Sequence, residues 1–464
     1  MNREEQQFVK MTQTPVKRLI ISLGIPTIIS MLVTAIYNLA DTFFVSNIGI
    51  GDERTYASGA VGVVFSLMAI VQAIGFMFGM GAGSLISSKL GEKKDEEAQV
   101  VASSAFYIAI ALGIILSIIC IIFMDSIMGL LGATDKVLPY ARSYALYIVF
   151  GFPVMVASFI MNNLLRAEGK SKLAMIGLTT GGVLNIGLDP LFIYVFKMGI
   201  SGAAIATLIS QVISALILLS MFIFKKSIIK LSIFKITKQF SIYLEIIKIG
   251  LPSLCRQGLA SIATILLNRQ AGLYGDEAAL SAMGIVSKIF MVIFSMCLGI
   301  GQGYQPVCGY NYFAKKYDRV KEAMYFTFIF SLIFMTLFCL FFFIFAESVI
   351  KWFIDDDLKV IEIGKATLRY QCIALPFLTL NVITNMTFQS TKQKFKASLL
   401  SSCRQGIFFI PVILILPLLN GIQGVEMTQA IADFLTFLFT IPFFIGFVKK
   451  LNEQINQEVV RNEI

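Results

Sequence analysis

The sequence contains no histidine and a single tryptophan, and charged residues make up only 14% of its 464 positions. Without histidine, the commonest metal ligand and the most usual general base are missing. The seven cysteines lie singly in apolar segments without a Cys-x-x-Cys pair, which indicates packing rather than redox or metal-binding roles. We find no nucleophile–base pair and no metal motif, so the sequence predicts a protein that is not an enzyme and needs no cofactor.

Apolar residues are abundant instead, since 57% of the chain is hydrophobic and 41 residues are phenylalanine. No water-soluble domain needs so much apolar surface, so we expect a polytopic membrane protein. Runs of about 20 or more apolar residues predict twelve transmembrane helices and an all-α fold. The polar first stretch, MNREEQQFVKMTQTPVKR, lacks the short apolar segment of a cleavable signal peptide. The expected spans are 18–46, 57–86, 99–123, 139–165, 173–197, 200–224, 243–271, 279–309, 323–345, 359–389, 397–419 and 423–448.

The net charge of +10 raises the question of a nucleic-acid partner, but the placement of the charges answers it. With a cytoplasmic N-terminus, the inward loops and tails hold about 26 Lys and Arg and the outward ones about 6, which is a positive-inside bias. An even number of spans returns the C-terminus to the same side. The basic charge therefore sets the membrane topology, with both termini cytoplasmic, and no nucleic-acid partner is expected.

An internal repeat relates the two halves of the chain. The stretch SLGIPTIISMLVTAIYNLADTFFVSNIG (22–49) aligns without a gap with KIGLPSLCRQGLASIATILLNRQAGLYG (248–275), and FGMGAGS (78–84) matches LGIGQGY (298–304). Pro153 likewise matches Pro376. In the first alignment, Gly24, Pro26 and Gly49 stand over Gly250, Pro252 and Gly275.

The repeat predicts four segments: an N-terminal six-helix bundle (1–223), a cytoplasmic linker (224–242), a C-terminal six-helix bundle (243–450) and a cytoplasmic tail (451–464). Each half has an even number of spans, so both enter the membrane from the same side. We therefore expect the bundles to be related by a pseudo-two-fold axis along the membrane normal, with a cleft between them and alternating access by rocking.

Two acids lie inside apolar runs of the first half. An ionised carboxylate at the centre of a membrane helix costs about 2.5–3.5 kcal/mol on insertion scales, so such residues are usually functional. Counting from the expected helix ends places Asp41, Asp189 and Thr207 at a similar depth, roughly 12 Å below the outer interface. Asn185 lies one turn before Asp189 and shares its helix face.

These four oxygen-bearing side chains form a candidate coupling site for a cation. Two carboxylates in a dry pocket cannot both stay ionised at low cost, and binding of H⁺ or Na⁺ would relieve their repulsion. Oxygens from Asp41, Asn185, Asp189 and Thr207 suit Na⁺ as a hard ion, whereas protonation alone would suit H⁺. The alternative is a set of ordinary interhelical hydrogen bonds, above all for Asn185 and Thr207.

Further polar and polarisable residues are candidates for contact with a substrate. Asp433 is a third intramembrane acid, with Gln211 as its approximate counterpart in the first half, and it either binds a cationic substrate or pairs with Arg269. Tyr37 and Met283 are candidates for lining a broad cleft, because aromatic faces attract cations and methionine adapts to varied ligands. Plain packing is the alternative for each of them.

Two arginines are candidates for gating. The tetrapeptide CRQG occurs twice, at 255–258 and 403–406, which places Arg256 and Arg404 at the cytoplasmic side of the second half. Paired arginines there would gate that half, whereas for Arg256 the alternative is snorkelling to the inner interface.

The order and spacing of several motifs resemble the multidrug and toxic compound extrusion (MATE) family, and within it the MepA/DinF-like branch. They are the GIP…YNLADTFFVSNIG opening, GMGAGSLISSKLG, LNIGLDPLFI and GLPSLCRQGLASI…LLN. In DinF-like relatives the matching Asp, Asn, Asp and Thr form a cation site, so the resemblance assigns that role to Asp41, Asn185, Asp189 and Thr207.

The resemblance implies a secondary active exporter, an H⁺- or Na⁺-coupled antiporter of amphipathic, mostly cationic organic compounds. Its expected partners are small-molecule drugs and membrane lipid, and it is expected as a monomer in a bacterial cytoplasmic (inner) membrane. A flippase for lipid-linked precursors is the alternative, although such a protein would need a strongly basic cavity and the interior charges here include three acids.

Overall fold

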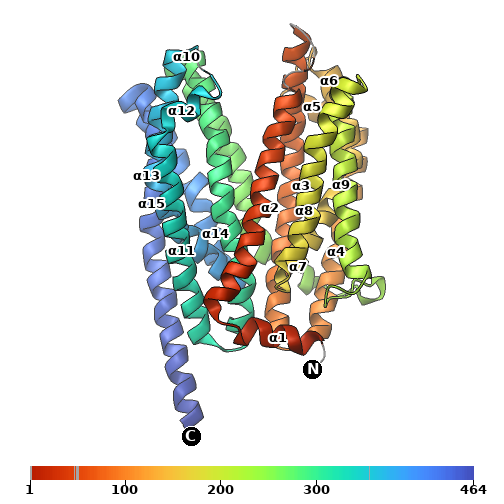
Figure 1. The fold of residues 1–464 in the computed structure, drawn as a ribbon, viewed down its shortest axis with the longest axis vertical. Helices are drawn as coiled ribbons and strands as arrows, with labels where there is room; N and C mark the ends of the chain where they lie inside the picture. The colour runs from red at the N-terminus through yellow and green to blue at the C-terminus, as the bar shows by residue number, and fades with distance from the viewer. Residues whose placement is uncertain (1–2, 46–47, 49–51, 355, 464) are drawn as a thin grey trace. The chain divides into compact units, whose positions relative to one another are not determined.

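The structure, a computed structural model, describes residues 3–45, 48, 52–354 and 356–463. Gly49, an anchor of the repeat, lies outside these residues. All regular secondary structure in the described ranges is helical, which confirms the all-α prediction (Figure 1). The α-helices are α1 (Arg3–Gln13), α2 (Val16–Val45), α3 (Asp52–Gly91), α4 (Asp95–Ile122), α5 (Met124–Leu130), α6 (Leu138–Phe150), α7 (Phe152–Ala167), α8 (Ser171–Pro190), α9 (Gly199–Ile223), α10 (Phe240–Phe313), α11 (Tyr317–Ile344), α12 (Ala346–Lys351), α13 (Leu358–Ser390), α14 (Lys394–Ser402) and α15 (Phe409–Glu463). Two π-helices, η1 (Leu191–Val195) and η3 (Cys403–Ile407), and a 3-10 turn, η2 (Ile233–Lys235), complete the set.

Nine helical stretches of the described chain are long and apolar enough to cross a membrane, and the bent pair α6–α7 makes a tenth. Two of the nine are too long for one crossing and contain non-helical residues, at Gly275 and Asp276 in α10 and at Gly421 in α15. Each of these breaks falls between two predicted spans, so each long helix supplies two crossings. The count of twelve spans predicted from the sequence is thereby confirmed.

The chain forms two compact units, and three helices, α1, α2 and α10, take part in both. The first unit holds the residues up to Val9 together with Ile29–Gly250, and the second holds Lys10–Ile28 and Leu251–Ile464. The division therefore passes through α1, α2 and α10, and the changes in α2 and α10 fall near the start of the aligned stretches of the two repeats. The predicted bundles change over at the linker 224–242, whereas the compact units change over at Gly250.

Glycine explains why α10 joins the first unit at its start. A Cβ atom added at Gly250 would lie 1.9 Å from the carbonyl oxygen of Met77, and one added at Gly81 would lie 2.1 Å from that of Ile246. Only glycine allows α3 and α10 to pack backbone against backbone at this distance. The second unit repeats the arrangement, because a Cβ at Gly303 would lie 2.5 Å from the Cα of Gly24 in α2.

In the second unit, α13 and α15 lie side by side, and the last turns of α15 continue beyond the neighbouring helices to the C-terminus (Figure 1). Thr440 of α15 accepts a hydrogen bond from Asn381 of α13 at 3.1 Å. Asn385 of α13 donates to the carbonyl of Ala397, as Asn162 of α7 donates to that of Ala174 in the first unit. The internal repeat thus extends to individual hydrogen bonds.

Glu168, directly after α7, binds the linker (224–242) to the rest of the first unit. Its carboxylate is fully buried and accepts hydrogen bonds from the backbone N–H groups of Ile228 at 2.9 Å and Ile229 at 3.3 Å, and from the Ser227 hydroxyl. Lys170 forms an ion pair with the same carboxylate at 3.2 Å. The linker is therefore an ordered part of the first unit, at least over these residues.

Replacing Glu168 by alanine is expected to release the linker, because hydrogen bonds to a charged acceptor are worth about 1.5–3 kcal/mol and three donors would lose theirs. Trypsin should then cleave after Lys225, Lys226 and Lys230 about tenfold faster in the purified protein. Glu322→Ala, at an exposed position on α11, is the matched control. Equal cleavage of the two variants would contradict the role of Glu168.

Candidate acidic site and cavity

Asp41 lies in the last turns of α2, a helix formed by the apolar run that begins near Leu19. The residue is 9% exposed, and its carboxylate accepts a hydrogen bond from the hydroxyl of Tyr144 on α6 at 3.3 Å. Tyr144 also interacts electrostatically with Asp189, and its hydroxyl lies near the side chain of Thr207. Tyr144 therefore connects Asp41 with the polar residues of α8 and α9.

Small residues bring α8 and α9 together beside Asp41. A Cβ atom at Gly181 would lie 2.8 Å from the Cβ of Ser214, and the Ser214 hydroxyl donates to the Gly177 carbonyl at 2.8 Å. Close packing of this kind is how glycine and serine hold membrane helices together. It aligns the polar face of α8 with that of α9.

Asn185 is the centre of that polar face. Its amide nitrogen donates to Asp189 Oδ1 at 3.0 Å and to the Thr207 hydroxyl at 3.2 Å. Asp189 is fully buried, and it interacts electrostatically with Asp41. The structure thus brings together all four residues of the predicted cation site, although their role remains a prediction.

Three acceptor oxygens of this group have no hydrogen-bond partner in the described part of the chain: Asp41 Oδ1, Asn185 Oδ1 and Asp189 Oδ2. Buried polar atoms are normally satisfied, so three unsatisfied acceptors in one cluster mark a place where protons or a cation would bind. Carboxylate, amide and hydroxyl oxygens are hard ligands, and the donor set fits H⁺ or Na⁺. Among the described residues we find no cluster of three or more His, Cys, Asp or Glu side chains that would suit a transition metal.

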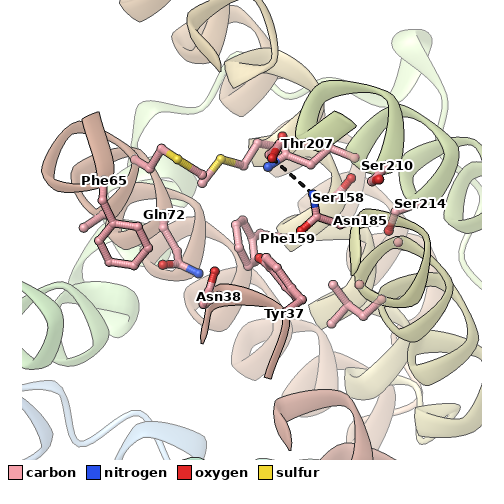
Figure 2. Close-up of a pocket in the computed structure, with 17 residues that line it drawn as sticks. Tyr37, Asn38, Phe65, Gln72, Ser158, Phe159, Asn185, Thr207, Ser210 and Ser214 are labelled. Atoms are coloured by element: carbon pink, nitrogen blue, oxygen red, sulfur yellow. Dashed lines mark hydrogen bonds between the residues drawn. The ribbon is translucent and has the colours of Figure 1, made fainter. Parts of the chain in front are cut away.

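A cavity lies beside the acidic site, with an empty volume of about 700 Å³ including its open mouth (Figure 2). Tyr37 and Phe159 supply aromatic walls, and Asn185 and Thr207 lie at its edge, where Figure 2 marks their hydrogen bond. Asp41 and Asp189 are absent from its lining. The remaining lining residues are Asn38, Phe65, Met68, Ala69, Gln72, Met155, Ser158, Leu178, Gly181, Gly182, Ser210, Gln211 and Ser214.

The candidate substrate residues divide between the units. Tyr37 and Gln211 line the cavity of the first unit. Met283 is 1% exposed and belongs to the hydrophobic core of the second unit, where its contacts are those of packing. Asp433 is fully buried in the second unit, and its ion-pair partner is Arg404 at 2.9 Å, not Arg269.

The pairing also bears on the candidate gating residues. Arg404 lies on the π-helix η3 with its guanidinium engaged by Asp433, while Arg256 is half-buried on α10. The sequence shows the two arginines in identical tetrapeptides, but it does not indicate that Asp433 lies opposite Arg404 in the folded chain.

Sequence reasoning missed Tyr144, Asn38, Gln72, Ser158 and the serines of α9. A lone tyrosine in a predicted span has no local signal, because its acceptor Asp41 is 103 positions away. Ser210 and Ser214 lie four positions apart on one face of α9, a spacing of small residues that is typical of close helix packing, and only the folded chain exposes them to a cavity.

Comparison with known proteins matches the MatE family over residues 26–191 and 252–415, which together cover most of the chain and correspond to its two repeats. The chain belongs to the MatE family. This confirms the resemblance noted from the sequence motifs. Because members of this family are transporters, the protein is a multi-pass membrane transporter.

Relatives cover nearly the whole chain. The multidrug export protein MepA of Staphylococcus aureus (strain MRSA252) is 27% identical over 431 residues, 93% of this chain and 94% of that protein. MepA of Staphylococcus saprophyticus is 26% identical over 430 residues, with the same coverage.

Solved structures of similar fold also belong to transporters. An outward-facing multidrug resistance MATE family transporter of the MOP superfamily superimposes with a TM-score of 0.90 at 25% identity, covering 96% of this chain and 98% of that one. A MOP superfamily transporter from Pyrococcus furiosus, whose binding pocket is described as having reverse polarity, gives a TM-score of 0.89 at 26% identity, again over 96% and 98%.

Proposed function

We propose that this MATE-family transporter is a secondary active multidrug exporter that exchanges H⁺ or Na⁺ for amphipathic, mostly cationic organic compounds by alternating access. It acts in the cytoplasmic membrane, with both termini in the cytoplasm, as a monomer. The MepA relatives carry the name of multidrug export proteins, which supports the class of substrate.

The observation that carries the proposal is that the acidic site and the cavity share two residues. Asn185 and Thr207 line the cavity, and the same Asn185 amide holds Asp189 Oδ1 and the Thr207 hydroxyl. A cation that binds the unpartnered oxygens of Asp189 and Asn185 acts on the same side chains that form this hydrogen bonding and part of the cavity wall. The coupling is reciprocal, so a substrate in the cavity changes the affinity for the cation by the same factor.

The chemistry of the first unit favours export of cations over transport of lipid pyrophosphates. The cavity lining contains no Lys or Arg among the described residues, and two carboxylates lie behind it. A polyphosphate head group needs basic side chains at its binding site. The aromatic faces of Tyr37 and Phe159 instead suit an amphipathic cation.

The first test is efflux of ethidium from proteoliposomes containing the purified full-length protein, with a pH gradient and a Na⁺ gradient imposed separately. We expect one of the two gradients to accelerate efflux about tenfold over the rate without a gradient, since coupling energies are typically about 1–3 kcal/mol. An ionophore that collapses the effective gradient should abolish the acceleration.

The outcome also decides between the candidate functions. Acceleration by only one gradient identifies the coupling ion. If neither gradient drives ethidium or any other tested cation, the exporter proposal is contradicted, and lipid flipping becomes the function to test.

A further inference from the structure

A buried pair of opposite charges lies in the second unit, which contributes no residue to the cavity described above. Arg404 Nε donates to Asp433 Oδ1 at 2.9 Å, and Gln429 Nε2 donates to the same oxygen at 2.7 Å. Asp433 is fully buried and Arg404 is 7% exposed. Yet Asp433 Oδ2 and Arg404 Nη2 have no hydrogen-bond partner within the described residues, so the pair leaves an acceptor and a donor unused.

Two aromatic rings complete the surroundings of the guanidinium. Its central carbon lies 4.6 Å from the ring centroid of Phe290 and 4.3 Å from that of Phe294. The two rings stack with centroids 5.5 Å apart and an interplanar angle of 18°. Aromatic faces beside a carboxylate form a site that attracts any planar cation, and Arg404 occupies it here.

Arg404 is held by a backbone that departs from the regular α-helix. It lies in the π-helix η3 between α14 and α15. Short π-helical turns within longer helices occur frequently at functional sites. Arg404, which occupies the site between the aromatic rings and Asp433, thus lies in the irregular part of its transmembrane span.

The internal repeat relates the ion pair to two residues of the first unit. Asn162 and Asn385 are equivalent in the two repeats, and the same spacing makes Gly181 the counterpart of Arg404. The spacing between Gly202 and Gly424 makes Gln211 the counterpart of Asp433. Gly181 and Gln211 both line the cavity of the first unit. The second unit therefore places an ion pair where the first unit has a ligand-sized space.

We propose that Asp433, Phe290 and Phe294 form a binding site for organic cations with a guanidinium or amidinium group, and that Arg404 is a tethered competitor that expels the bound cation. The proposal rests on the function proposed above and adds to it a second substrate site with a defined head group. When Arg404 leaves, the site accepts the ligand, and when it returns, the ligand is released.

The unused oxygen explains how a free ligand competes with a tethered arginine. Arg404 bonds one carboxylate oxygen through Nε alone, whereas an amidinium presents two parallel N–H groups and can bind both Asp433 oxygens. Such bidentate pairs are the stronger form of this interaction. The planar ligand would stack on Phe290 and Phe294 as the guanidinium does now.

The test measures benzamidinium binding to the purified full-length protein by isothermal titration calorimetry. We expect Arg404→Ala to bind it at least about tenfold more tightly than the wild type, because the tethered competitor acts at an effective concentration of about millimolar. Arg404→Gln, which keeps hydrogen bonding to Asp433 without the charge, should give a smaller gain. In proteoliposomes, Arg404→Ala should lower both KM and kcat for benzamidinium efflux, because release becomes slow.

The control is Arg269→Ala, which removes an exposed arginine from α10 of the same unit. This variant should bind benzamidinium with the affinity of the wild type. The neutral double variant Arg404→Ala/Asp433→Asn should lose the gain. Equal affinity of wild type, Arg404→Ala and Arg404→Gln, or a gain that persists in the double variant, would overturn the proposal. Adding Asp41→Asn to Arg404→Ala should stop gradient-driven efflux but preserve tight binding, so failure of the coupling site and failure of this site give different results.

Discussion

Asp41→Asn is expected to reduce gradient-driven ethidium efflux by about 5- to 150-fold, the range that a coupling energy of about 1–3 kcal/mol spans. Asparagine has nearly the same volume and keeps an oxygen that can accept the Tyr144 hydrogen bond, so the packing of α2 against α6 should persist. It carries no charge, however, and can neither take up a proton nor neutralise Na⁺. The driving gradient then has no means of acting on the cavity.

The matched control is Asp125→Asn, which makes the same chemical change at an exposed carboxylate that pairs with Arg142 at 3.7 Å in the first unit. Exposed pairs contribute little, so this variant should transport like the wild type. Ethidium binding measured without a gradient should be retained by both variants. Full efflux by Asp41→Asn would show that the exporter works without this site and that the coupling residue lies elsewhere.

Gly250→Ala is expected to have the largest effect on stability. The added methyl group would lie 1.9 Å from the Met77 carbonyl oxygen, and a backbone atom cannot move aside as a flexible side chain can. Overpacking typically costs about 1–3 kcal/mol, and a clash between two backbones belongs at the upper end of that range. We expect the temperature of unfolding in detergent to fall by about 3 °C, because the entropy of unfolding grows with chain length and this chain has 464 residues.

Gly258→Ala is the control, eight positions further along the same helix, where an added Cβ meets nothing within 4 Å. Alanine is the better helix former, so this variant should be as stable as the wild type or slightly more so. Gly81→Ala should reproduce the effect of Gly250→Ala, since its Cβ would lie 2.1 Å from the Ile246 carbonyl. Similar unfolding temperatures for Gly250→Ala and Gly258→Ala would contradict the close packing of α3 and α10.

Much of the fold could be predicted because its signals are local in the sequence. Apolar runs of membrane length specify helices whatever surrounds them, and the breaks at Gly275 and Gly421 fall between runs that the sequence already separates. The candidate cation site could be predicted for a similar reason. An acid such as Asp41 or Asp189 is conspicuous in an apolar run, and counting residues along a helix gives its depth.

The helices, their number, the internal repeat and the four oxygen-bearing residues of the acidic site could all be read from the sequence. The contacts could not: Tyr144 donates to Asp41, Asn185 lies between Asp189 and Thr207, and Arg404 pairs with Asp433 in the folded chain. The passage of α2 and α10 through both compact units is also a tertiary result. The physical reason is that helix formation depends on neighbours along the chain, whereas pairing depends on which faces the packed helices present to one another.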